Sequence, residues 1–391
     1  MPYPRDAAAS LPKDADAALL VGRVFRPDVA GPSVVAVRSG DVHDISAAAP
    51  TMRDLLEADD PAGIARHAAG ERLGSVAEIL ANTPPDARDP EKPWLLAPID
   101  LQAVKAAGVT FVISLLERVV EEQARGAPER AAEIRREIQA LIGEDLARLK
   151  PGSAEAMALK NLLVQRKMWS QYLEVGIGPD AEIFTKMQPM SAAGSLVDIG
   201  IRADSTWNNP EPEVVLAVNS KGAILGATLG NDVNLRDFEG RSALLLSKAK
   251  DNVASGSLGP FIRLFDEGFS LDDVRRTELS LTVQGTDGYR LEGASLMEKI
   301  ARDPADLVAA AIDENHQYPD GFVLYLGTLF APIEDRDEPG QGFTHKVGDI
   351  VTIVADRLGA LVNRVVYCED AEPWTFGTGA LMRNLARRGL I

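Results

Sequence analysis

Short runs of hydrophobic and β-branched residues, bounded by turn signals, predict β-strands along most of this chain. In its first part these runs lie at residues 19–25, 33–37 and 42–45. Two short helices are predicted after them, at residues 51–56 and 61–69. Residues 82–92 are rich in proline, aspartate and charge. We expect this stretch to close a small N-terminal α+β domain over residues 1–93.

A charged helical segment follows. Its glutamates and arginines recur at three- and four-residue spacings, as on solvated helix faces. The predicted helices cover residues 115–124, 129–149 and 154–173. Two short apolar runs before them, residues 94–98 and 109–113, predict buried strands. We expect the helical block, about residues 115–173, to be an insertion in a larger β-rich domain over residues 94–391.

Strands and turns dominate the chain after residue 179. The predicted strands are residues 183–186, 214–218, 223–229, 279–283, 322–326, 350–354 and 361–367. Helices are predicted at residues 295–302 and 303–313. The pattern therefore indicates an α+β protein with a β-rich main domain.

Three carboxylates stand at the two ends of one predicted hairpin. Pro210 and Pro212 favour an extended backbone at the residues before them, so Glu211 and Glu213 should share one face. A turn at residues 219–222 would return the chain and bring Asp232 beside them. Three carboxylates without histidine or cysteine suit a hard cation such as Mg²⁺. The alternative is two solvated glutamates and an aspartate that caps a turn.

Composition narrows the range of partners. The 391 residues carry a net charge of −17, which argues against a nucleic acid or an anionic membrane surface, because both need a basic surface on the protein. The single cysteine, Cys368, excludes an internal disulfide framework and a cysteine-rich zinc site. We see neither a secretory leader nor an apolar run of membrane length, and expect a cytoplasmic protein.

The ordered string of motifs resembles the fumarylacetoacetate hydrolase superfamily. Glu211-Pro212-Glu213 and residues 231–237, Asn-Asp-Val-Asn-Leu-Arg-Asp, match its Glu-x-Glu…Asn-Asp-Val-x-x-Arg-Asp signature. Further matches in the same order are Lys250 with Gly259-Pro260, Gly327-Thr328, Gly348-Asp349 and Gly359…Asn363. The aspartate of the family's lysine motif is misplaced here, since Asp251 follows Lys250 directly.

The resemblance implies a mixed, rolled β-sheet catalytic domain behind a small N-terminal domain. It also implies that Glu211, Glu213 and Asp232 bind Mg²⁺, with Mn²⁺ or Ca²⁺ as possible substitutes. Family substrates are 2-oxo acids or β-diketone acids, so a small anionic 2-oxo acid is the expected partner. Family members are usually dimeric or larger, so we expect a homodimer or homotetramer.

Two departures from the family pattern point to a dehydratase branch. Hydrolytic members carry Tyr-x-x-His-x-x-Glu, but residues 111–117 place Ser114 at the histidine position. A serine hydroxyl cannot replace imidazole as a general base near neutral pH. Glu239 stands where hydrolases usually have glutamine. The chain resembles superfamily members that dehydrate 2-keto-3-deoxy-pentonates, including 2-keto-3-deoxy-xylonate, to 2,5-dioxopentanoate.

Several side chains are candidates for the chemistry. Lys250 would steady an enolate or move a proton, because a metal nearby disfavours its ammonium form; the alternative is a salt bridge to Asp251 or Asp232. Glu117 is a candidate acid or base, or else a solvated helical charge, and Ser114 would bond the leaving hydroxyl. The candidates for holding the substrate are Arg118, Arg236, Lys186 and Thr328.

Two rival functions stay open at this level. One is a hydrolase that cleaves a 2,4-diketo acid, which the missing histidine disfavours. The other is a non-catalytic member that binds a metal and a keto acid as a sensor. Lys250 and Thr328, retained beside the three carboxylates, favour an enzyme.

Overall fold

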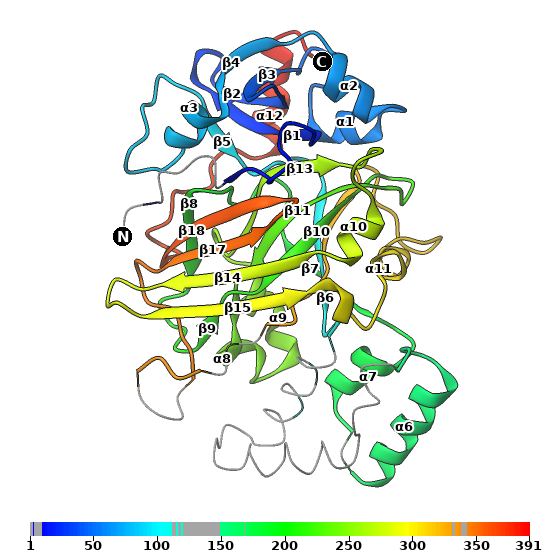
Figure 1. The fold of residues 1–391 in the computed structure, drawn as a ribbon. Coiled ribbons are helices and arrows are strands. Elements are labelled where there is room, and N and C mark those ends of the chain that lie inside the picture. Colours follow the sequence, from blue (N-terminus) through cyan, green and yellow to red (C-terminus); the bar gives the residue numbers. More distant parts are fainter. Residues whose placement is uncertain are drawn as a thin grey trace.

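The computed structural model describes most of the chain. It covers residues 3, 10–111, 115, 119, 149–167, 169–330, 332, 334–337 and 342–391. Within these residues the strands form two large mixed sheets and a two-stranded sheet of β9 (Asn208–Asn209) and β12 (Asn234–Leu235), and helices lie at the ends and edges of the large sheets (Figure 1). The predicted α+β class and mixed-sheet architecture are confirmed.

The larger sheet runs through the whole molecule. Its strands, in spatial order, are β4 (Glu71–Ser75), β3 (Asp41–Asp44), β2 (Gly31–Arg38), β1 (Leu20–Arg26), β13 (Gly256–Leu264), β11 (Ile224–Asp232), β10 (Pro212–Val218), β16 (Phe322–Tyr325), β6 (Ala103–Gly108) and β7 (Glu182–Met187), and β5 (Trp94–Leu96) pairs with β1. β1 pairs with β13 through Leu20↔Arg263 and Val21↔Ile262. One sheet therefore joins the N-terminal strands to the rest, and the domain boundary at residue 93 stays a prediction.

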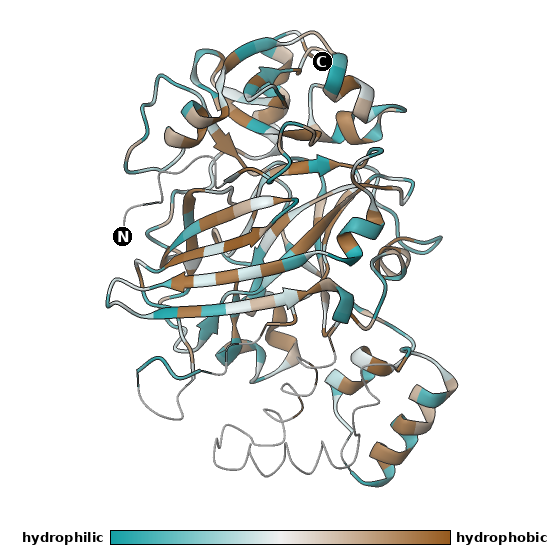
Figure 2. Cartoon of the chain, viewed as in Figure 1, coloured by the Kyte–Doolittle hydropathy of each residue, from teal (hydrophilic) through white to brown (hydrophobic). Residues whose placement is uncertain are grey.

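The second sheet covers one side of the first. Its order is β15 (Arg290–Leu296), β14 (Glu278–Gln284), β17 (Ile350–Ala355), β18 (Gly359–Tyr367) and β8 (Val197–Ile201). One core cluster includes Leu216 and Leu229 of the first sheet and Leu281 and Ile353 of the second. The strands carry much of the apolar, brown colour in Figure 2, so the main core lies between the two sheets.

Helices gather in three places. The N-terminal strands are flanked by α1 (Met52–Glu57), α2 (Pro61–His67), α3 (Val76–Ala81) and the returning α12 (Thr378–Arg387), which lies beside β2 in Figure 1. α6 (Ala154–Gln165) and α7 (Gln171–Ile177) form a separate pair, and α8 (Arg236–Glu239), α9 (Leu246–Lys250), α10 (Leu271–Arg275) and α11 (Pro304–Ala311) connect strands. In the described part of the chain, every helix is too short or too polar to cross a membrane.

Three predicted elements are wrong in detail. Residues 295–302 are not a helix, because Ser295 pairs with Leu279 in the β14–β15 ladder and only Met297–Lys299 form a 3₁₀ turn. The strand predicted at residues 109–113 is replaced by β6, since Val109 has a positive φ of 54° that ends the extended backbone. The helix predicted at residues 154–173 is broken into α6 and α7 after Lys167, whose φ is 59°. The helices predicted at 115–124 and 129–149 lie almost entirely outside the described residues.

Candidate metal centre

The hairpin of β10 and β11 brings the three predicted carboxylates together. Pro212 pairs with Asn231 and Glu213 with Gly230, and the Asp232 amide donates to the Glu211 carbonyl at 3.0 Å. One oxygen from each of Glu211, Glu213 and Asp232 lies within 4.8 Å of the others. The two-residue spacing of the glutamates in an extended chain therefore places both on the side where Asp232 returns.

All three carboxylates are buried, with exposed fractions of 6% for Glu211 and 2% for each of the other two. Burial, together with Asp232 and Glu211, raises the pKa of Glu213 well above its ordinary value. The Gly327 amide donates to Glu213 Oε2 at 2.7 Å. Gly327 has a φ of 86°, and a Cβ there would collide with Thr110, so only glycine fits this approach.

Two lysines bind the carboxylates. Lys250 Nζ lies 2.5 Å from Glu211 Oε2 and 3.0 Å from Asp232 Oδ2. Lys186, which is fully buried, lies 2.9 Å from Asp232 Oδ1 and also donates to the carbonyls of Val233 and Lys250. β7 carries Lys186 and α9 carries Lys250, and these two elements pack together.

The charges in this cluster shift its pKa values in opposite directions. Burial lowers the pKa of Lys250, but Asp232, Glu211 and Glu239 outweigh burial and raise it above the ordinary value. Burial lowers the pKa of Lys186, and attraction to Asp232 only partly offsets this. Burial raises the pKa of Asp232, yet the two ammonium groups hold it below its ordinary value. The carboxylates by themselves therefore favour the ammonium form of Lys250, and the alternative salt bridge to Asp232 is present. The opposite effect expected of a bound metal stays a prediction.

Two other candidates lie near the cluster. Thr328 directly follows Gly327, and its hydroxyl accepts from the Phe330 amide at 3.1 Å. Arg236 is buried in α8, where its guanidinium stacks 4.4 Å from the Trp207 ring centre and donates to the Pro332 carbonyl. Their roles toward a substrate stay predictions, as does that of Lys186. Ser114, Glu117 and Arg118 lie outside the described residues.

Two asparagines bond Glu211, one of the predicted metal ligands, through its backbone and its side chain. No role was predicted for them from the sequence. The Glu211 amide donates to Asn231 Oδ1 at 3.1 Å, and Asn234 Nδ2 donates to Glu211 Oε1 at 3.1 Å. Both asparagines lie close to Asp232 in the motif, on either side of it, and this position was the sequence feature that could have identified them as part of the site. The motif alone does not say which atoms they contact.

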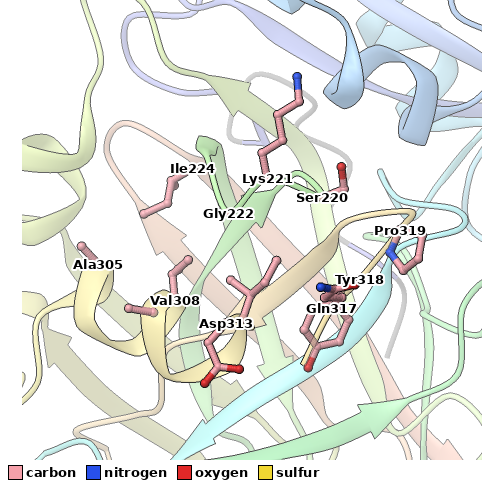
Figure 3. A pocket seen from close by; sticks show the side chains of 12 residues that line it. Ser220, Lys221, Gly222, Ile224, Ala305, Val308, Asp313, Gln317, Tyr318 and Pro319 are labelled. Atoms are coloured by element: carbon pink, nitrogen blue, oxygen red, sulfur yellow. The ribbon is translucent and has the colours of Figure 1, made fainter. Parts of the chain in front are cut away.

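Two cavities lie elsewhere. One of about 720 Å³ sits at the turn end of the hairpin, with Lys221 and Asp313 on different sides (Figure 3). Ser220 of this cavity lies along β10 and the following turn from Glu213, a distance of roughly 20 Å at about 3.3 Å per strand residue. The other, of about 410 Å³, has aromatic walls that include Trp94 and Trp374. None of the three carboxylates lines either cavity, so neither is the centre described above.

The donor set fits a divalent cation. Its members are three buried carboxylates, and burial, followed by repulsion from Asp232 and Glu211, raises the pKa of Glu213. Oxygen ligands of this kind are preferred by Mg²⁺, and a cation between them relieves the repulsion. Glu211, Glu213 and Asp232 would hold the ion.

Comparison with known proteins agrees with this architecture. Residues 207–366 match the family model described as "Fumarylacetoacetate (FAA) hydrolase C-terminal". The chain is 32% identical over 184 residues to the 2-dehydro-3-deoxy-D-arabinonate dehydratase of Saccharolobus solfataricus, an alignment that covers 47% of this chain and 58% of that protein. It is 26% identical over 336 residues to the "Probable 2-keto-3-deoxyxylonate dehydratase" of Haloferax volcanii, and this alignment covers 85% of this chain and 94% of that protein.

A solved structure shares the fold. It is described as 2-keto-3-deoxy-D-arabinonate dehydratase complexed with magnesium and 2,5-dioxopentanoate. The match has a TM-score of 0.62 at 20% identity and covers 89% of this chain and 99% of that one. The apo form of the same enzyme matches with a TM-score of 0.62 at 21% identity. Residues 207–366 of this chain therefore resemble the C-terminal domain of the fumarylacetoacetate hydrolase family, and the chain shares the fold of the solved dehydratase.

Proposed function

We propose that this protein is a divalent-metal-dependent dehydratase that removes one water from a 2-keto-3-deoxy-pentonate, such as 2-keto-3-deoxy-D-xylonate, and yields 2,5-dioxopentanoate. The observation that carries the proposal is the buried trio of Glu211, Glu213 and Asp232 in contact with Lys250 and Lys186. The names of the two relatives support the substrate class, and the described product complex supports magnesium.

A bound divalent ion would polarise the 2-oxo group and acidify the C3 protons. The chain supplies fixed positive charge beside that position, because the Lys250 ammonium is held by Glu211 and Asp232 and stabilises an oxygen that becomes anionic. A base removes a C3 proton, and the C4 hydroxyl leaves as water after protonation. A proton shift from C5 then gives the enol of the aldehyde, which becomes the aldehyde.

The remaining roles follow the sequence predictions. Glu117 acts as acid or base, Ser114 bonds the leaving hydroxyl, and Arg118, Arg236 and Thr328 hold the substrate. The proposal includes a small 2-oxo acid as partner, a homodimer or homotetramer, and a cytoplasmic location.

The test is an assay of the purified full chain. The protein is incubated with Mg²⁺ and a panel of 2-keto-3-deoxy acids, and the aldehyde is trapped. We expect aldehyde from a pentonate, and loss of most activity in Asp232→Asn. Asp313→Asn, an equal charge change at an exposed residue beside the distant cavity, serves as control. Release of a carbon–carbon cleavage fragment from 2,4-diketo acids, with 2-keto-3-deoxy-pentonates untouched, would show a hydrolase instead.

A further inference from the structure

The side-chain amide of Asn234 lies between two carboxylates. Its Nδ2 donates to Glu211 Oε1 at 3.1 Å and to Glu239 Oε2 at 2.5 Å. Asn234 has no exposed surface, and among the described residues its Oδ1 has no hydrogen-bond partner. The amide nitrogen of Asn234 therefore donates one hydrogen bond to Glu211, a predicted metal ligand, and the other to Glu239 of α8.

This arrangement permits only one orientation of the amide. A carboxylate accepts hydrogen bonds and an amide oxygen donates none. Turning the Asn234 amide by 180° would place its oxygen, Oδ1, against the carboxylates of Glu211 and Glu239. These oxygens would repel one another. Glu239 thus holds the Asn234 nitrogen toward Glu211, although no group in the described part of the chain bonds the amide oxygen.

The orientation matters because Asn234 controls one oxygen of Glu211. Lys250 holds Oε2 and Asn234 holds Oε1, while the Glu211 backbone is bonded to Asn231 and Asp232. A ligand carboxylate fixed in this way needs less reordering when an ion binds. Residues that orient ligands typically change metal affinity or activity by about 10–100-fold when removed.

We propose that Glu239 is a positioning residue of the metal centre, which acts through Asn234 to orient the carboxylate of Glu211. The inference rests on the proposed function only in that Glu211 is a metal ligand. Glutamine at position 239 keeps an acceptor but loses the charge, and charge-assisted hydrogen bonds are roughly twice as strong as neutral ones. A glutamate therefore holds the amide more firmly than a glutamine would.

The test measures Mn²⁺ binding to the full chain by electron paramagnetic resonance, at fixed pH and without substrate. Glu239→Ala should weaken binding by about 10–100-fold, and Glu239→Gln should recover part of that loss. Asp237→Ala is the matched control, because it removes a carboxylate of the same helix that bonds Ser205 and Thr206 instead. We expect it to bind Mn²⁺ as the wild type does.

A double variant decides the route of the effect. If Glu239 acts through Asn234, Glu239→Ala adds nothing to the loss already caused by Asn234→Ala. Additive losses, or equal effects of Glu239→Ala and Asp237→Ala, would overturn the proposal. If Glu239→Ala does not fold, Glu239→Gln replaces it, both alone and combined with Asn234→Ala, and Asp237→Asn becomes the control. The dehydratase assignment fails separately, because a chain that lacks dehydratase activity still reports Mn²⁺ affinity.

Discussion

Replacing Lys186 by methionine should destabilise the fold more than any comparable lysine replacement outside the centre. The Lys186 side chain is fully buried, and its ammonium pairs with Asp232 at 2.9 Å and donates to two backbone carbonyls. Methionine preserves most of the apolar stem. The change therefore removes the positive charge paired with Asp232 Oδ1 and the hydrogen-bond donor of two buried carbonyls.

The expected cost follows from breaking a buried pair by removing one partner, about 3–5 kcal/mol in the free energy of unfolding. Lys250 keeps its contact with Asp232, which places the expected value toward the lower end of that range. Lys105→Met is the matched control. Lys105 is also mostly buried, but in the described part of the chain its ammonium bonds only the Thr185 hydroxyl, and one such hydrogen bond contributes about 1 kcal/mol.

The assay is urea unfolding at constant pH in the presence of a chelator, with the free energy taken from the midpoint and slope. In the cycle of Lys186→Met, Asp232→Asn and the double variant, the double should cost less than the sum, by about 0.5–3 kcal/mol. The reasoning is refuted if Lys186→Met costs no more than Lys105→Met. Strict additivity with Asp232→Asn would refute it equally.

Three further predictions concern the metal and pH. Mg²⁺ at a hundred times its Kd should raise the free energy of unfolding by about 2.7 kcal/mol, and thermal-shift assays should show this gain lost in Glu211→Gln. Burial, Asp232 and Glu211 raise the pKa of Glu213, so protons compete with the metal for this carboxylate up to a higher pH than for an ordinary one. Calorimetry should find that the affinity for Mg²⁺ rises with pH, and that it rises less steeply in Glu213→Gln. Burial raises the pKa of Asp349, but Arg336 and His345 outweigh it and hold the pKa at about 2. An unfolded aspartate titrates near 3.8, so the pairing of Asp349 stabilises the folded state fully above that pH, and this stabilisation is lost as the pH falls toward 2. Acid-unfolding curves of Asp349→Asn should therefore show a smaller fall in the free energy of unfolding over this pH range than those of the wild type.

The sequence by itself determined the local parts of this protein. Glu211, Glu213 and Asp232 are separated by one tight turn, so strand periodicity and the turn signal suffice to bring them together. β10, β17 and β18 were predicted to within about two residues at each end. β13 was missed because Gly256, Gly259 and Pro260 interrupt its apolar run with residues that are depleted in strand interiors.

Only the tertiary structure decided what surrounds the carboxylates. Lys186 reaches Asp232 through the packing of β7 on α9. Gly327, far from Glu213 in sequence, reaches that carboxylate through the pairing of β16 with β10. The salt bridges of Lys250 depend on distances to carboxylates that no motif states, and these carboxylates raise its pKa. The joining of β1 to β13 is equally non-local. Local periodicity constrains which residues share a face, but burial and electrostatic interaction depend on distances in space, and these arise only when remote segments pack.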